Sequence, residues 1–159
     1  MKSACIIFLF FICYWEINGQ KVINITDFGL QPDSGQNAVS FVNKAIEACK
    51  KENGGILFFT KGWYDFWPHH CIEKEYFESN TTDNNPKRLA ILLEGMENIT
   101  LDGNGSLFIF HDRMQPVTVE NSKNILLKNF TIDWEFPLMS QGIVKATGTD
   151  FFDITTDPL

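Results

Sequence analysis

The chain opens with an apolar leader and then changes to helix-like and strand-like spacings. Residues 4–15 form an uninterrupted apolar run behind the positive charge of Lys2. The run is too short to span a bilayer, which takes about 20 apolar residues, and it fits the hydrophobic region of a signal peptide. Bulky residues before Cys13 argue against a lipoprotein anchor. We therefore expect residues 1–20 to be a signal peptide, and the mature chain to be secreted or periplasmic without a membrane span.

The first mature segment combines short strands with one helix. Apolar residues recur every three or four positions over about 36–50: Ala38, Val42, Ala45, Ile46 and Cys49. This spacing predicts an amphipathic helix with Asp33 or Ser34 as N-cap. Residues 22–25, 56–59 and 62–66 read as strands. Residues 67–88 are polar, aromatic and irregular, which predicts an excursion with a functional or capping role.

From about residue 89 onward, short strands alternate with Gly, Asn and Asp, and the pattern repeats. Residues 91–101 (ILLEGMENITL) align with residues 117–127 (VTVENSKNILL) in a 26-residue repeat. The identical positions are Glu94/Glu120, Asn98/Asn124, Ile99/Ile125 and Leu101/Leu127. Strands of period two within such a repeat predict coils of a parallel β-helix, with Asn98 and Asn124 stacked in a turn ladder. A weaker third copy starts at Val144.

The repeat places the chain in the all-β class. We expect a right-handed parallel β-helix over residues 21–159, whose coils begin at about residue 89 and whose first open edge is capped by the helix at about 36–50. An antiparallel sandwich also has short strands and turns, but it predicts no fixed 26-residue register.

Composition and charge narrow the possible partners. The 159 residues carry 13 Lys and Arg against 20 Asp and Glu, a net charge of −7, which argues against nucleic acid. Aromatic residues make up 14% of the chain, enough for a large buried area and a stacking surface. The mature chain keeps Cys49 and Cys71, whose pairing the sequence leaves open. Neither a CxxC motif nor His-rich spacing occurs, so we expect no metal and no cofactor.

Several motifs resemble known families. The DFG at 27–29, the AIEAC at 45–49, the NGG at 53–55 and the GWY at 62–64 resemble the start of pectate-lyase-like right-handed β-helix proteins. Others resemble glycoside hydrolase family 110: WYDFWP at 63–68, LEGM at 93–96, GNGSLFIFH at 103–111, IDWE at 132–135 and SQG at 140–142. The second resemblance covers roughly residues 21–145.

The second resemblance implies an exo-acting, inverting, metal-independent α-1,3-galactosidase that acts on galactose-terminated oligosaccharides or glycans. Family members are several times longer than this chain, and their proposed catalytic carboxylates lie beyond the matched part. The resemblance therefore implies that the chain is an N-terminal fragment whose catalytic pair lies downstream of Leu159, and that the fragment alone is inactive.

Inverting hydrolysis needs two carboxyl groups about 6.5–9.5 Å apart. The candidates within the chain are Asp133 and Glu135, which in an extended segment face the same side roughly 6.5–7 Å apart. Trp134 between them and Trp67 are candidate sugar platforms, and Arg113 could fork two sugar hydroxyls. The alternatives are structural: a turn at Asp133, Trp134 in the core, Trp67 in a hydrophobic plug, and a solvated pair of Asp112 with Arg113.

Two other functions stay open. A pectin-active β-helix hydrolase or lyase has the same fold, although the carboxylate clusters for a lyase's Ca²⁺ site are not evident. A carbohydrate-binding or adhesive β-helix module would need no catalytic carboxylates at all.

Overall fold

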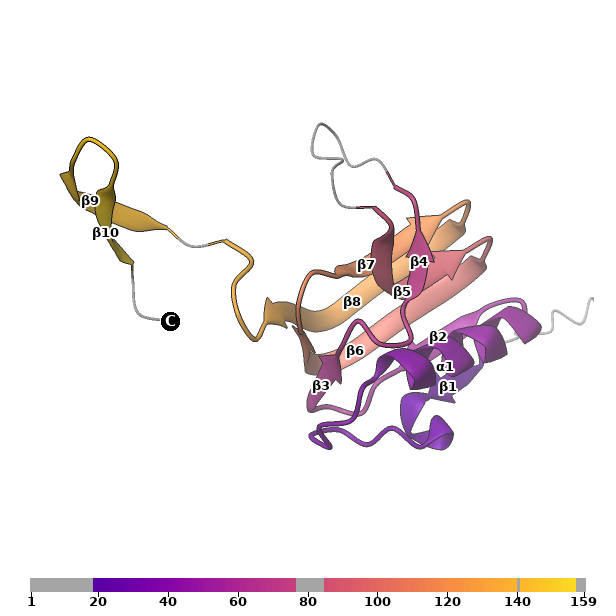
Figure 1. Ribbon diagram of the computed structural model, residues 1–159. Coiled ribbons are helices and arrows are strands. Elements are labelled where there is room, and N and C mark those ends of the chain that lie inside the picture. Colours follow the sequence, from indigo (N-terminus) through magenta and orange to yellow (C-terminus); the bar gives the residue numbers. More distant parts are fainter. Residues whose placement is uncertain (1–18, 77–84, 140, 157–159) are drawn as a thin grey trace, which may run out of the picture.

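The computed structural model describes residues 19–76, 85–139 and 141–156 (Figure 1). Within these residues, ten strands accompany one α-helix and one short 3₁₀ helix, which confirms the all-β class. The expected signal peptide lies almost wholly outside the described residues. No helix in the described part is long and apolar enough to cross a membrane.

In chain order the elements are β1 (Val22–Asn24), η1 (Ile25–Phe28), α1 (Val39–Lys51), β2 (Gly55–Phe58), β3 (Trp63–Phe66), β4 (Ile72–Lys74), β5 (Lys87–Glu94), β6 (Glu97–Phe110), β7 (Gln115–Glu120), β8 (Lys123–Trp134), β9 (Gly142–Thr147) and β10 (Phe152–Thr156).

The helix forms where its apolar spacing predicted it, from Val39 instead of about residue 36. All five residues of the predicted apolar face, which lie within or just before α1, are buried: Ala38, Val42, Ala45, Ile46 and Cys49. The predicted caps were wrong, because the Asp33 carboxylate accepts the backbone N–H of Trp63 at 2.7 Å instead. The Asn37 side chain accepts the N–H of Val39 at 3.2 Å at the start of α1.

The body of the molecule consists of stacked parallel layers: β2 and β3 lie in the first, β5 and β6 in the second, and β7 and β8 in the third. β2 and β3 both pair with β6 in parallel, and β6 pairs with β8 in parallel. In the first half of β6, Ile99 pairs with Ile125 of β8, and on the neighbouring sheet Ile91 of β5 pairs with Val117 of β7. Both pairings follow the predicted 26-residue register, which is therefore confirmed. The turn ladder is confirmed too, since the Asn124 side-chain amide donates to Asn98 Oδ1 at 2.6 Å.

The sheets are mixed, and a single right-handed parallel β-helix is not confirmed. One sheet holds β1, β2, β3, β6 and β8, all parallel. A second sheet holds β4, β5 and β7, where β4 runs antiparallel to β5. The weak third repeat copy is absent from the described residues, because β9 and β10 form an antiparallel hairpin that stands away from the layers (Figure 1). The N–H of Gly148 closes its turn on the Phe151 carbonyl at 2.8 Å.

A corner divides β6 and β8 into two halves. Before it, Asp102 pairs with Lys128, and after it, Ser106 pairs with Phe130, so the register shifts at the corner. Between the two registers, residues 103–105 of β6 face only Asn129 of β8. The layers come very close there, because a Cβ on Gly103 would lie 2.5 Å from the Cβ of Phe130. Any residue larger than glycine at position 103 would therefore clash with the neighbouring layer.

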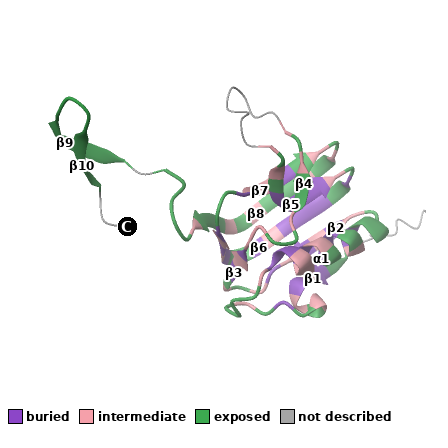
Figure 2. Ribbon diagram, viewed as in Figure 1, coloured by how far each residue is buried: buried purple, intermediate pink, exposed green. Residues whose placement is uncertain are grey.

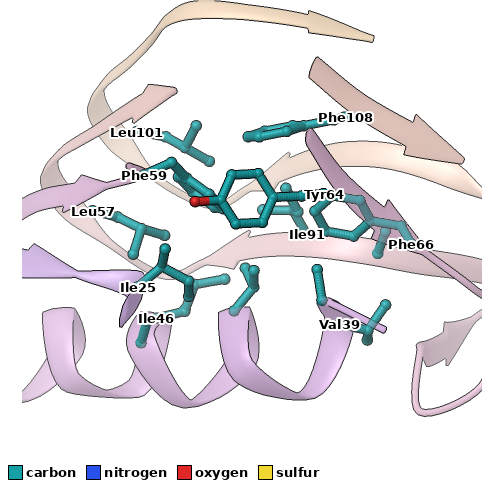
Figure 3. Packing of buried hydrophobic residues seen from close by; sticks show 14 of the residues in the cluster. Ile25, Val39, Ile46, Leu57, Phe59, Tyr64, Phe66, Ile91, Leu101 and Phe108 are labelled. Carbon is teal, nitrogen blue, oxygen red and sulfur yellow. The ribbon is translucent and has the colours of Figure 1, made fainter. Parts of the chain in front are cut away.

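The core lies between α1 and the layers and is rich in aromatic rings (Figure 3). Phe108 is fully buried, with ring centroids of Phe59 and Phe130 at 4.8 and 4.9 Å. Burial decreases toward β8 (Figure 2). Leu101 on β6 is fully buried, whereas its partner Leu127 on β8 is 38% exposed. The inward side of β8 thus presents apolar surface to solvent.

Candidate functional site

Three side chains stack in a column where parallel strands end: Trp67 follows β3, His111 follows β6 and Glu135 follows β8. The residues just before them are paired in register: Phe66, Phe110 and Trp134. The ladder continues one position further, since the N–H of His111 donates to the Phe66 carbonyl at 2.9 Å and that of Glu135 to the Phe110 carbonyl at 3.1 Å. The register of the paired strands therefore determines where the three side chains of the column lie.

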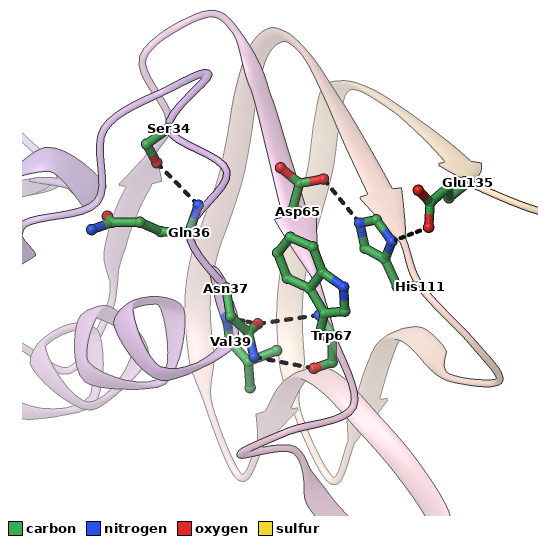
Figure 4. A network of polar contacts seen from close by, with 8 residues as sticks. All are labelled: Ser34, Gln36, Asn37, Val39, Asp65, Trp67, His111 and Glu135. Carbon is green, nitrogen blue, oxygen red and sulfur yellow. Dashed lines mark hydrogen bonds and ion pairs between the residues drawn. The ribbon is translucent and has the colours of Figure 1, made fainter.

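His111 bridges two carboxylates (Figure 4). Its Nδ1 lies 2.8 Å from Glu135 Oε2, and its Nε2 lies 2.9 Å from Asp65 Oδ1. A ring that carries protons on both nitrogens can donate to both carboxylates. The His111 and Asp65 side chains are only 10% and 14% exposed, whereas that of Glu135 is 52% exposed. The network thus runs from the interior to the surface and ends on Glu135.

Trp67 and Asn37 support this network from the first layer. The Trp67 indole is stacked on the His111 imidazole, with ring centroids 4.1 Å apart and planes 8° apart. Asn37 Oδ1 accepts the N–H of Trp67 at 3.2 Å (Figure 4). The side-chain amide of Asn37 donates to the His69 carbonyl at 2.8 Å. The backbone of Asn37 also forms an isolated parallel β-bridge with the backbone of Asp65. The segment before α1 and the strand β3 therefore hold the imidazole from one side.

The two predicted carboxylates have different partners in the structure. Glu135 belongs to the column, but Asp133 is exposed, and its carboxylate accepts the backbone N–H of Trp134 at 2.8 Å. In the pair formed by Asp65 and Glu135, the imidazole fills the space that an inverting enzyme leaves for water. The pair of Asp65 and Glu135 therefore lacks the arrangement of an inverting catalytic pair. Both offer carboxylate oxygens that can accept hydrogen bonds from sugar hydroxyls.

The predicted substrate-binding residues lie in three different settings. Trp67 is in the column. Trp134 packs its indole against Phe110 at 5.8 Å, beside the core, and its buried Nε1 has no hydrogen-bond partner in the described residues. Arg113 is exposed on the turn between β6 and β7. The expected pair of Asp112 with Arg113 is not formed, because Asp112 pairs with Arg88 at 3.2 Å.

Asp65 and His111 were not among the sequence candidates. Their signal was an alignment of WYDFW at 63–67, LFIFH at 107–111 and TIDWE at 131–135, which the strand register superimposes. In each segment two inward apolar residues alternate with outward ones, and the final outward position belongs to the column.

A second polar cluster joins the excursion to the repeat. Lys74 on β4 donates to Glu94 Oε1 at 2.6 Å and to Glu120 Oε2 at 2.8 Å, and the Tyr76 hydroxyl donates to Glu120. Hydrogen bonds from Lys74 and Tyr76 lower the pKa of Glu120, and those to Glu120 and Glu94 raise the pKa of Lys74. Like charges opposite each other on neighbouring strands repel, so Lys74 stabilises the repeated glutamates. We call this cluster the lysine clamp.

Cys49 and Cys71 are free thiols in the structure. Burial raises the pKa of each thiol to about 11. Among the described residues, no group of three or more His, Cys, Asp or Glu side chains is spaced to hold a metal ion.

The fold and site define an all-β protein of stacked parallel strand layers with a column of aromatic, imidazole and carboxylate groups at one edge. No family model matches the chain. Alpha-1,3-galactosidase B of Bacteroides thetaiotaomicron is 52% identical over 155 residues, which cover 98% of this chain and 25% of that protein.

Two further relatives carry similar names. Alpha-1,3-galactosidase A of Shewanella woodyi is 44% identical over 127 residues, covering 80% of this chain and 21% of that protein. Alpha-1,3-galactosidase B of Phocaeicola vulgatus is 44% identical over 138 residues, covering 84% of this chain and 23% of that protein. The chain is a homologue of proteins named α-1,3-galactosidase, consistent with an N-terminal part of a family 110 glycoside hydrolase. It spans about a quarter of the length of these relatives.

Proposed function

We propose that the full-length protein is a glycoside hydrolase that releases terminal α-1,3-linked galactose from glycans with inversion. The observation that carries this proposal is the 52% identity to a named α-1,3-galactosidase over 98% of the chain. We place the described residues in the N-terminal part of the enzyme and the catalytic carboxylates in a part that follows, so that this part alone is inactive. The imidazole between Asp65 and Glu135 supports that placement, because it leaves no room for a hydrolytic water.

We extend the fold in the same proposal to a right-handed parallel β-helix capped by α1. The parallel pairing of β6 with β8 and of β5 with β7, in the same 26-residue register, supports it. So does the apolar inward side of β8, which would be covered by a further parallel layer. We also propose export through a signal peptide at residues 1–20, on the apolar run at residues 4–15.

Charge favours a neutral glycan over pectin. Asp65, Asp133 and Glu135 lie on the same outward side of the parallel sheet, at or beside the column. The carboxylates of polygalacturonate would be repelled by them, and the net charge of −7 adds to this repulsion. The hydroxyl groups of a neutral galactoside can instead donate hydrogen bonds to carboxylate oxygens.

The experiment is an assay of the purified full-length protein on three substrates: an α-1,3-galactosyl oligosaccharide, its α-1,4-linked isomer and polygalacturonate. We expect galactose from the first substrate, and proton NMR at early times should show its β-anomer before mutarotation. Retention would overturn the inverting mechanism. Cleavage of polygalacturonate without galactose release would favour the pectin-active alternative, and glycan binding without cleavage would favour a binding module.

A further inference from the structure

We propose that Trp63 and Asp33 form a binding site for a neutral, galactose-bearing glycan, in which the indole stacks on a sugar ring and the carboxylate accepts a sugar hydroxyl. The choice of sugar rests on the proposed function. Trp63 begins β3 in the first layer, and alternation along the strand places its side chain on the outward side, opposite the buried Tyr64. Trp63 is 51% exposed, so a large aromatic face is open to solvent in this layer.

This exposure does not arise from an unpaired layer. On one side of β3, Trp63 pairs with Leu107 of β6. On the other side, the segment before α1 is hydrogen-bonded to the strand: the Asp33 N–H donates to the Trp63 carbonyl at 3.0 Å, and the Ala38 N–H donates to the Asp65 carbonyl at 2.8 Å. Both edges of β3 are thus occupied, and further layers stacked on β8 would not cover its outward side.

The Trp63 indole has no internal ring partner among the described residues. The other two tryptophans in this part of the chain do have one, since Trp67 is stacked on His111 and Trp134 packs against Phe110. Within the same residues, no lysine or arginine lies over the Trp63 ring either. Covering the large apolar face of an indole is favourable, and here a ligand can cover it.

The backbone that carries the indole is fixed before a ligand arrives. Asp33 Oδ1 accepts the N–H of Trp63 at 2.7 Å, and the Gly62 carbonyl accepts the N–H of Leu107 at 3.0 Å. A Cβ on Gly62 would lie 2.5 Å from the Cβ of Pro32, so the turn that contains Asp33 packs directly against this backbone. A preformed site loses little conformational freedom on binding.

The chemistry of the site favours a neutral ligand with many hydroxyl groups. Asp33 is exposed, and Trp63 occupies its Oδ1, which leaves Oδ2 to accept a hydrogen bond. The C–H groups on one face of a galactose ring form an apolar patch that can cover an indole, while its hydroxyls donate to a carboxylate. An apolar protein surface would bury that carboxylate without a donor. An anionic polymer would be repelled by it and by the net charge of −7.

The test uses the full-length protein labelled with fluorotryptophan. The probe is thio-linked α-1,3-galactosyl galactose, because sulfur in place of the glycosidic oxygen resists hydrolysis. Trp63→Tyr assigns the Trp63 resonance in fluorine NMR by its loss. We expect this resonance to shift saturably with the probe, and an oligomer of galacturonate to leave it unchanged.

Asp33→Asn separates the carboxylate from the fold. The asparagine oxygen can still accept the Trp63 N–H, while its amide nitrogen takes the place of Oδ2 and cannot accept. The Kd of the probe, read from the Trp63 resonance, should rise about fivefold to tenfold, with the melting temperature nearly unchanged. The control is Val22→Ala on β1, where Val22 is 57% exposed, and it should leave the Kd unchanged.

The outcomes are distinct. A Trp63 resonance that does not respond to the probe overturns this inference, and so does one without a solvent isotope shift between light and heavy water, which would show that the indole is covered in the full-length protein. A Kd unchanged in Asp33→Asn overturns the role of the carboxylate. A wild type that releases no galactose while its Trp63 resonance responds overturns the proposed function and leaves the site, and the reverse result overturns this inference alone.

Discussion

The central prediction concerns Phe108, which lies at the centre of the aromatic core. Its side chain is fully buried, and it contacts rings of the first and third layers, Phe59 at 4.8 Å and Phe130 at 4.9 Å. Burial of a phenylalanine removes about 150–250 Å² of largely apolar area from water, worth roughly 4 kcal/mol after allowance for the alanine that remains. Phe108→Ala should therefore lower the free energy of opening of these layers by about 4 kcal/mol, within the usual range for such changes.

Hydrogen exchange of the full-length protein measures this free energy of opening for individual segments of the chain. Peptides covering β6 and β8 should exchange about a thousandfold faster in Phe108→Ala, since each factor of ten corresponds to about 1.4 kcal/mol. Phe108→Leu keeps most of the volume and should cost about 1–1.5 kcal/mol. Val119→Ala is the control, because Val119 is 46% exposed on β7 and its truncation should cost about 0.5 kcal/mol or less. An acceleration below about tenfold in Phe108→Ala would refute the reasoning that the ring joins the three layers.

Four further outcomes are expected. Lys74→Met should lower the hydrogen-exchange protection factors of β4. In the wild type the clamp should be intact above pH 4.5, the ordinary pKa of Glu120, and weaken as the pH falls through the lowered folded pKa; protection factors of β4 that are independent of pH down to about pH 3 would contradict this. Gly103→Ala should lower the melting temperature, because its Cβ would lie 2.5 Å from that of Phe130, and an unchanged value would show that the layers can separate. Cys49 should resist iodoacetamide in the native protein at about pH 8 and react after denaturation, as mass spectrometry can show, and native labelling at the rate of a free thiol would contradict its burial. Residues 21–159 expressed alone should aggregate through the inward side of β8, where Leu127 is 38% and Ile132 is 37% exposed, and a cooperatively melting monomer by calorimetry would contradict this.

The sequence was most informative where local spacing and repetition act directly. The helical face of α1 could be predicted because its apolar residues follow the helical period, and all of them are buried. The register of β6 on β8 could be predicted from identical residues such as Ile99 and Ile125, which the structure pairs. Asn98 and Asn124 adopt positive φ of 56° and 55°, as expected of matched turns.

The column could not be predicted from that repeat. Its members are spaced unequally along the chain, because the excursion lengthens the first layer and the corner shortens the third. A search with a single period therefore cannot superimpose Trp67, His111 and Glu135. The alternation of side chains along a strand would by itself have placed Trp134 on the core side, since the residue between two outward carboxylates faces inward. Its indole does pack beside the core.

The antiparallel strand pairings could not be predicted from local sequence patterns either. β4 is very short, and its partner β5 lies beyond a segment that local spacing cannot bridge. The hairpin of β9 and β10 shares apolar alternation with the repeat, so periodicity does not distinguish the two. The turn closed by Gly148 decides its direction.

The corner between the two halves of β6 bears on how such a chain tolerates insertions and deletions. Residues 103–105 of one layer span the same corner as Asn129 in the next, so the layers differ there by two positions while the ladders on both sides stay intact. Because side chains alternate with a period of two, a change of two positions keeps every following side chain on its own face. A change of one position would invert the strand that carries the column. Length variation among homologous layers should therefore occur in even steps at this corner, which also makes it a suitable place to engineer an inserted loop.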